Sequence, residues 1–341
     1  MSKNRVRPLL TRPGARFVCH GDGLCCTDVH LLGPVAREEA AAIALIEPEA
    51  LLRFAGLRLL DQSSGSCVFL EEPAPGRGMA ATRCRIYGHD GGRTKPRTCD
   101  RYPYLLVATP DGGRVGTDHR CPCRTMGERP PLDPAAAEGP LSSRAGRITV
   151  DRRLPARIPI TARQRVGWAR YRRLEAELFA AMERDVDAAL GPAFPALEDM
   201  GWAQVATDLA LDMPPTKWGW ACRTFAVFVG ELTGGPPARA THRPWRAVFD
   251  RAEARSPEQD PEAMLVDFVL DAIWSLEWAW RGPLDLARAE LATRVQVVRA
   301  MARHIAAHGA RPDRAMAEAL AIAEIAGVSD AWSTVVDRMR P

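Results

Sequence analysis

Cysteine is the residue type whose distribution points most clearly to chemistry in this chain of 341 residues. Eight of the nine cysteines fall within the first 123 residues, and only Cys222 lies beyond them. Thiolates are soft ligands that suit zinc, copper(I) and iron–sulfur clusters. Because a cluster takes four thiolates that can converge from separate loops, we predict a metal centre built from this set: Cys19, Cys25, Cys26, Cys67, Cys84, Cys99, Cys121 and Cys123.

The residues beside the cysteines favour tight loops around a centre. Glycines near the first cysteines let the backbone fold closely, and Pro96 and Pro103 stiffen the loop that carries Cys99. Cys25 and Cys26 are adjacent in the sequence, so their side chains do not easily point at one iron. Either they serve different centres, or one of them has a structural role. Eight thiols suffice for two four-cysteine centres, and one centre with spare cysteines is equally consistent with the sequence.

Zinc, disulfide bonds and simple burial are the competing explanations for these cysteines. The N-terminal segment has no long apolar region and no small-residue cleavage site, which predicts a cytoplasmic protein. In a reducing compartment, a dense set of thiols favours metal binding over a disulfide framework. The paired C-x-x-C spacing of zinc ribbons is absent, so an iron–sulfur cluster is favoured over zinc. For Cys222, which lies in a predicted helix away from other cysteines, we expect simple burial.

Histidines accompany the cysteines in the N-terminal part, and imidazole is a ligand for zinc and iron. The four candidates are His20, His30, His89 and His119. His119 is the preferred one because it lies two residues before Cys121. A surface position or a hydrogen bond within the protein is the commoner use of histidine and is the alternative for each.

The cysteine motifs, taken in order, resemble a known family. F-x-C followed by C-C, then C-x-F-L, C-x-I-Y and K-P-x-x-C-x-x-Y-P are similar to the YkgJ-type cysteine-cluster proteins, which are described as zinc- or iron-chelating. The same order resembles the N-terminal part of the flagellin lysine N-methylases. That group pairs a cysteine cluster with methyl transfer from S-adenosylmethionine. The resemblance covers residues 17 to 123.

The resemblance implies which cysteines are ligands. Family cysteine positions are occupied by Cys19, Cys25, Cys26, Cys67, Cys84 and Cys99, and Cys121 matches a trailing Cys-Pro. Many relatives have a further cysteine where this chain has Asp22, which is either a carboxylate ligand or a cap for the turn. Cys123 adds a thiol that would compensate for this departure.

Three functions follow as hypotheses. The first is a metal-binding protein with an iron–sulfur cluster and no assigned reaction, whose helical part docks a protein partner. The second, implied by the resemblance, is an S-adenosylmethionine-dependent lysine N-methylase that takes a protein substrate. The third is a zinc-stabilised interaction module. No G-x-G-x-x-G, Walker A or radical-SAM C-x-x-x-C-x-x-C motif occurs, so no reaction is assigned.

Charge and hydropathy argue against two other classes of partner. The formal net charge is only +4, and arginines are scattered among acidic residues, so we expect no nucleic-acid partner. No apolar run reaches the ~18–20 residues that a membrane span requires, so we expect no membrane association.

The chain that must position the cysteines has two parts, which differ in amino-acid composition. All nine tryptophans lie at or after Trp168, whereas the cysteines lie early. We therefore predict a cysteine-rich metal module over 1–126, a linker over 127–160 and a helical domain over 161–341. The expected fold is mainly α, with a small irregular α+β N-terminal module.

Local patterns predict the individual elements. The N-terminal part is expected to contain a helix over 37–54, strands over 66–70 and 83–87, and a hairpin of 104–108 with 114–117 around Thr-Pro-Asp-Gly-Gly. Apolar residues at helical spacing predict C-terminal helices over 162–189, 197–211, 218–231, 261–280, 284–308, 313–325 and 330–339.

Overall fold

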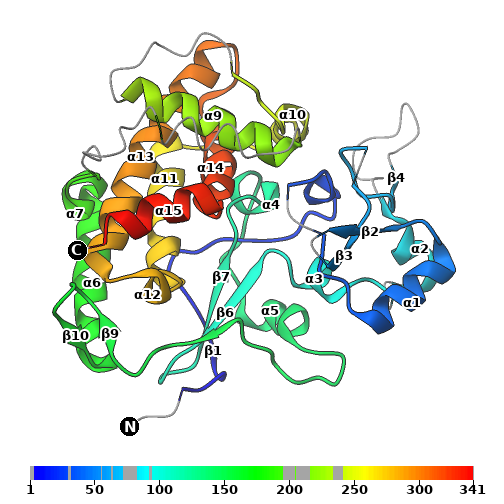
Figure 1. The fold of residues 1–341 in the computed structure, drawn as a ribbon, viewed down its shortest axis with the longest axis horizontal. Helices are drawn as coiled ribbons and strands as arrows, with labels where there is room; N and C mark the ends of the chain where they lie inside the picture. The colour runs from blue at the N-terminus through cyan, green and yellow to red at the C-terminus, as the bar shows by residue number, and fades with distance from the viewer. Residues whose placement is uncertain are drawn as a thin grey trace.

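The computed structural model is a mixed, mainly α-helical protein, as predicted (Figure 1). It describes residues 4–29, 32–54, 56–62, 64–71, 83–91, 94–194, 204, 216–232 and 241–340. Helices form one side of the molecule, and the short N-terminal elements extend to the other side, with the main sheet beneath and between them (Figure 1).

The main sheet has four strands in the order β1-β7-β6-β8. β6 (Tyr104–Ala108) and β7 (Gly113–Thr117) form the predicted antiparallel hairpin. β1 (Leu9–Thr11) runs parallel to β7, and β8 (Arg152–Arg153) runs parallel to β6. The hairpin is therefore the centre of the sheet, and two distant segments complete its edges.

Two glycines allow β1 to approach the hairpin closely. A Cβ atom on Gly113 would lie 2.6 Å from the carbonyl oxygen of Val6, and one on Gly112 would lie 2.3 Å from that of Pro8. Gly112 also has a φ of +153°. Only glycine leaves room for the incoming N-terminal strand at these two positions.

The helical part surrounds one buried helix, α14 (Pro312–Gly327), which contacts α9, α10, α11 and α13. Its alanine-rich sequence lets neighbouring helices pack closely, and nearly all its residues are buried. The other elements of this part are α6 (Trp168–Arg184), α7 (Val186–Leu190), α9 (Lys217–Leu232), α10 (Arg246–Glu253), α11 (Pro261–Trp274), α12 (Trp278–Arg281), α13 (Leu284–Ala307) and α15 (Asp330–Arg338).

Most of the predicted helices are present, with two differences and one range that is not described. The range 261–280 is broken because Leu276 adopts a positive φ of 59°, which ends α11 and separates it from α12. The range 162–189 contains a short strand, β10 (Arg165–Val166), before α6 and α7. The predicted helix over 197–211 lies almost wholly outside the described residues.

The N-terminal predictions were partly wrong. The helix expected over 37–54 is α1 (Arg37–Ile46), after which β2 (Leu51–Phe54) pairs with β3 (Leu57–Leu60). Pro48 explains this change, because proline disfavours helical geometry in the residue before it and cannot donate to the helix. The expected strands are reduced to β4 (Leu70–Glu71) and β5 (Arg83–Cys84), and residues 85–90 form helix α2 (Arg85–Asp90).

Residues 127–160 contain packed structure. They include α5 (Pro134–Leu141), β8 and β9 (Ile158–Pro159), which pairs with β10. Leu132 and Leu141 pack with Phe17 and Val115 in a shared apolar cluster. This stretch therefore belongs to the same core as the sheet.

A buried network of charges joins the N-terminal segment to α11. Arg12 Nε lies 2.6 Å from Asp271 Oδ1, and Arg124 Nη2 lies 2.5 Å from Asp271 Oδ2. Arg12 and Arg124 also both pair with Asp267. Burial alone would raise the pKa of Asp271, but the adjacent Arg124, His119 and Arg12 hold that pKa well below its usual range.

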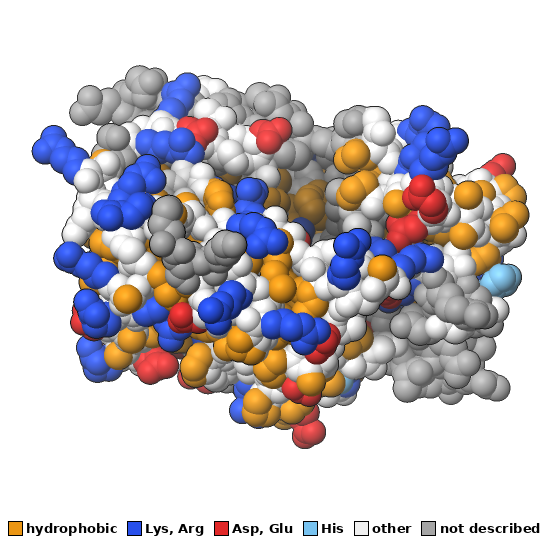
Figure 2. Space-filling model, turned by 90° about the horizontal axis from the view of Figure 1, so that it is seen from below, with side chains coloured by type: hydrophobic (Ala, Val, Ile, Leu, Met, Phe, Trp, Pro, Cys, Tyr) orange, Lys and Arg blue, Asp and Glu red, His pale blue; other side chains and the backbone are white. Residues whose placement is uncertain are grey.

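Arginine and lysine side chains are dispersed over the face shown in Figure 2, with acidic side chains among them. No single described helix has the length and apolar composition of a membrane span, although α14 and α15 meet the test jointly as a pair bent by 72°.

Candidate metal centre

Three predicted ligands form a hydrogen-bonded chain, named here the Cys123 group: Cys19, Cys121 and Cys123. Cys19 and Cys121 each form a side-chain hydrogen bond with Cys123. Cys121 and Cys123 lie at the start of α4 (Pro122–Thr125) and are buried, whereas Cys19 lies in the segment after β1. The hydrogen bond to Cys123 is the largest cause of the raised pKa of Cys19, followed by burial.

Four further predicted ligands gather around a second apolar cluster and are named the Cys67 group: Cys26, Cys67, Cys84 and Cys99. The Cys67 N–H donates to the Cys26 carbonyl at 2.8 Å. Burial raises the pKa of Cys67 to about 11, with a further contribution from Cys84. Burial also raises the pKa of Cys99, and both Cys67 and Cys84 add to this increase. The four cysteine side chains pack in or against the same apolar cluster, so the thiols lie near one another.

Cys25 lies between the two groups. Its thiol donates to Cys26, and this bond is the first cause of a pKa well above the usual value. Cys19 raises the pKa of Cys25, and Cys25 in turn raises the pKa values of Cys99 and Cys121. The adjacent cysteines of the short 3-10 helix η1 (Leu24–Cys26) are therefore close to thiols of both groups.

Short elements between residues 24 and 101 position the thiols of the Cys67 group. In the Cys67 group, Cys26 comes from η1, Cys84 ends β5, Cys99 lies in α3 (Arg97–Arg101), and Cys67 precedes β4. Gly21 and Gly23 adopt positive φ values of 68° and 66°, which produce the tight turns before η1. The glycine-rich loop predicted from the sequence is thus present.

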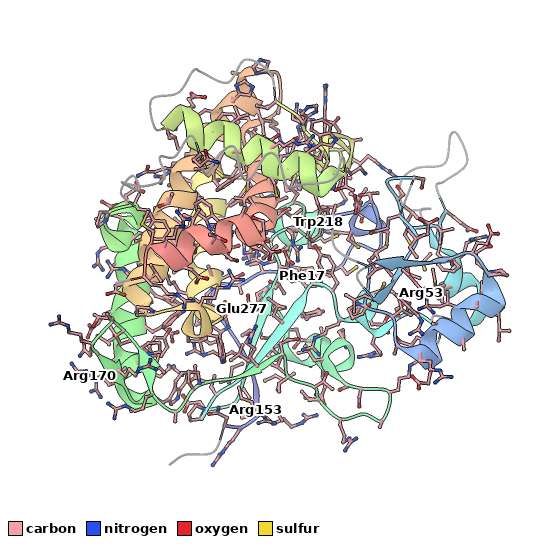
Figure 3. The ribbon with its side chains drawn as sticks, viewed as in Figure 1. Phe17, Arg53, Arg153, Arg170, Trp218 and Glu277 are labelled. Atoms are coloured by element: carbon pink, nitrogen blue, oxygen red, sulfur yellow. The ribbon has the colours of Figure 1, made fainter. Side chains whose placement is uncertain are left out.

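The start of α9 holds the turn that follows Cys26. Lys217 Nζ donates to the carbonyl of Thr27 at 3.0 Å and to that of Gly65 at 2.7 Å. Trp218 Nε1 donates to the carbonyl of Asp28 at 3.0 Å, and Figure 3 shows Trp218 at the end of α9 that faces the thiol-bearing loops. The helical part therefore supports the η1 turn directly.

Both carboxylate oxygens of Asp22 accept hydrogen bonds from other groups of the protein. Its Oδ2 accepts from Arg255 Nε at 2.7 Å, and its Oδ1 accepts from the Leu24 N–H at 3.2 Å. Arg255 also donates to Cys123 Sγ at 3.5 Å, and Asp22 Oδ1 lies 3.8 Å from the same sulfur. Arg255 could not be predicted as a neighbour of Cys123, because it lies 132 residues away and in no recognisable motif.

The histidines contribute less than the cysteines. His119, the preferred candidate, is buried, and its Nε2 lies 3.0 Å from Asp271 Oδ2. His20 and His89 are exposed, and burial and Arg255 lower the pKa of His20. His30 lies outside the described residues. Cys222 is buried in α9, and burial alone raises its pKa to about 11.

The thiols lie near one another, but their side chains are not arranged as the ligands of a bound metal ion. Among the described residues, no group of three or more His, Cys, Asp or Glu side chains is arranged to hold a metal ion. The donor set nevertheless suits a soft metal, because it is nearly all sulfur. Since metal ions bind thiolates, a bound cation would replace the protons that the raised pKa values retain.

Comparison with family models, curated proteins and solved structures found no match to this chain.

Replacing Asp22 by asparagine tests whether the carboxylate is a ligand. We expect unchanged metal content, because the carboxylate is engaged by Arg255 and by the Leu24 N–H. Loss of the buried ion pair should lower the free energy of unfolding by about 1–3 kcal/mol. Metal analysis and urea unfolding measure both effects, with Asp133→Asn at an exposed helix cap as the control. Loss of metal from Asp22→Asn alone would make Asp22 a ligand.

Proposed function

We propose that this chain is a cysteine-cluster metal-binding protein that holds an iron–sulfur cluster, with zinc as the alternative. The observation that carries the proposal is the gathering of eight thiols from separate segments into two adjacent groups. All of these cysteines are free. Thiols brought together across about 100 residues of chain are better explained by a shared ligand than by independent burial.

The Cys67 group is the proposed principal site. It supplies four thiols, the number that binds a [2Fe–2S] or [4Fe–4S] cluster. Its walls are apolar, with Phe69 and Ile86 fully buried beside the cysteines. Such a shell limits solvent access and tunes the reduction potential of a cluster.

Lys95 would assist metal binding by the Cys67 group. Its positive charge lowers the pKa values of Cys99 and Cys25, against the larger effects that raise them. A cation beside the thiols favours the thiolate form, which is the form that binds metal. Lys95 Nζ lies 3.5 Å from Asp100 Oδ1, so part of its charge is already balanced.

The Cys123 group, together with Cys25, is the proposed second site. Side-chain hydrogen bonds link Cys19, Cys121 and Cys123, and the charge of Cys25 raises the pKa of Cys121. Arg255 donates to the Cys123 sulfur, which would stabilise negative charge there. In this arrangement Cys25 and Cys26 serve different centres.

Anaerobic purification followed by a visible spectrum and by iron, sulfide and zinc analysis tests the proposal. We expect a brown protein with equal iron and sulfide, at about four of each per chain for one [4Fe–4S] cluster and about eight for two. A colourless protein with stoichiometric zinc would support the alternative metal. A folded protein without any metal would contradict the proposal.

A further inference from the structure

Two histidine side chains at the end of α13 lie against each other. The ring centroids of His304 and His308 are 4.3 Å apart, with an angle of 38° between the ring planes. The two residues are four positions apart in the sequence, a spacing that places side chains on the same face of a helix. The structure therefore presents two neighbouring imidazoles on one helical face.

The hydrogen bond of His308 determines which of its ring nitrogens can bind a metal ion. Nδ1 lies 2.8 Å from the carbonyl oxygen of His304. Because a carbonyl oxygen only accepts hydrogen bonds, Nδ1 carries the proton, and the lone pair of the neutral ring is on Nε2. Histidines that bind metals usually have this arrangement, in which the second ring nitrogen donates to a carbonyl or a carboxylate. His308 is also exposed, so an ion can reach it from solvent.

Phe228 of α9 orients the other ring of the pair. The ring centroids of Phe228 and His304 are 5.4 Å apart, in an edge-to-face arrangement with an angle of 71°. Phe228 is buried where α9 packs against α13, so its position is fixed by the core. One imidazole is thus oriented by packing and the other by a hydrogen bond, which reduces the entropy lost when an ion binds to both.

The electrostatics around the pair agree with a bound cation. Burial and the neighbouring His308 lower the pKa of His304, which favours the neutral imidazole that binds metal ions. The negative charge of Glu231 in α9 acts in the opposite direction on the same group, so a carboxylate lies near the rings. The C-terminal end of a helix also carries partial negative charge, and α13 ends at Ala307 beside the pair.

Helix capping is the competing explanation for these histidines, because a cationic side chain near a helix C-terminus interacts favourably with the last carbonyls. Capping requires only one histidine, and it is strongest when that histidine is charged. The structure instead brings two imidazoles into contact, and two charged rings at this distance would repel each other. The arrangement therefore favours a ligand that both rings share.

We propose that His304 and His308 together bind a divalent transition-metal ion of the nickel and zinc class. Neutral imidazole is a ligand for both metals, and two histidines four residues apart on a helix can chelate one ion. Two imidazoles fill only part of the coordination shell, so water would complete it and binding would be reversible. The proposal is independent of the cysteine centre, because neither histidine is one of its proposed ligands.

Calorimetric titration of the full-length protein with Ni²⁺ tests the proposal. We expect His304→Gln and His308→Gln each to weaken binding by about 100-fold or more, because each removes one of the two donors that hold the same ion. His242→Gln is the matched control and should leave the affinity unchanged, since His242 is exposed and its ring lies 3.8 Å from that of Trp220, centroid to centroid. Nickel bound by the cysteines would produce thiolate-to-nickel absorption, which binding by imidazoles lacks, so the same titration distinguishes the two sites.

Two results would overturn the proposal. The first is equal nickel binding by the wild type and by a variant that carries both His304→Gln and His308→Gln. The second is equal affinity of the His308→Gln and His242→Gln variants. His308 is exposed and follows the last residue of α13, so its variant should fold even if the change at His304 disturbs the contact with Phe228. Circular dichroism of each variant verifies that it is folded before titration.

Discussion

Replacing Cys99 by serine is expected to remove metal from the protein and to destabilise its N-terminal part. Cys99 lies with Cys26, Cys67 and Cys84 in the proposed principal site. A serine hydroxyl is a poor ligand for a soft metal, so the site would lose one of four thiolates. Loss of a structural metal is among the few changes that cost on the order of 4 kcal/mol or more. Metal analysis and thermal unfolding measure the two effects.

Cys222→Ser is the matched control, because Cys222 is a buried cysteine that lies away from the other thiols, in α9. The variant should keep its full metal content. Placing a hydroxyl in the apolar helical core should cost about 1–3 kcal/mol, without affecting the N-terminal part. Equal metal content in Cys99→Ser and Cys222→Ser would show that the ligand assignment is wrong.

Replacing Asp271 by asparagine is expected to lower the free energy of unfolding by about 3–5 kcal/mol. The substitution preserves shape but removes the charge that Arg12 and Arg124 share in the interior. The Arg12 side chain is 4% exposed and that of Arg124 is 0% exposed, so water cannot replace the carboxylate. Urea unfolding of the wild type and the variant measures the difference.

Asp187→Asn provides the comparison, since Asp187 pairs with Arg299 on the surface with a side chain that is 62% exposed. Exposed ion pairs contribute about 0–1 kcal/mol, so this variant should remain close to the wild type. A similar loss in the two variants would mean that the buried network contributes no more than a surface pair.

The stabilisation by Asp271 should also depend on pH. Its pKa is below the usual value in the folded protein, so folding favours the ionised form. The contribution is therefore fully present above the unfolded pKa of about 3.9 and decreases as the pH falls below it. The difference between the wild type and Asp271→Asn should accordingly shrink in acid, which unfolding curves at pH 7 and pH 3.5 can measure.

Sequence patterns predicted the parts of the fold that depend on local interactions. The β6–β7 hairpin follows from its Asp-Gly-Gly turn, and α13 follows from its apolar spacing. The structure of residues 47–54 was predicted wrongly because alanine and leucine composition outweighed the single Pro48. β1 was not predicted, because three residues carry no periodic signal and their partner strand lies about 100 residues later.

The sequence identifies the cysteines of the proposed metal centre but not how the structure groups them. Cysteine spacing indicates a metal centre, but the assignment of Cys26 to one group and Cys123 to the other depends on long-range packing. Arg255 and Lys217 support the thiol loops from the helical part and have no local signal.

The attachment of Arg12 to α11 has a consequence for the synthesis of this protein on the ribosome. Arg12 and Asp271 are separated by 259 residues, so at roughly 5–20 residues per second about 13–50 s pass between the emergence of the two. During that interval the N-terminal strand has no charged anchor, and the loops that carry Cys19, Cys25 and Cys26 lack the Lys217 and Arg255 contacts for most of the time. The nascent cysteines therefore meet cellular metal and oxidants before the helices that support them exist.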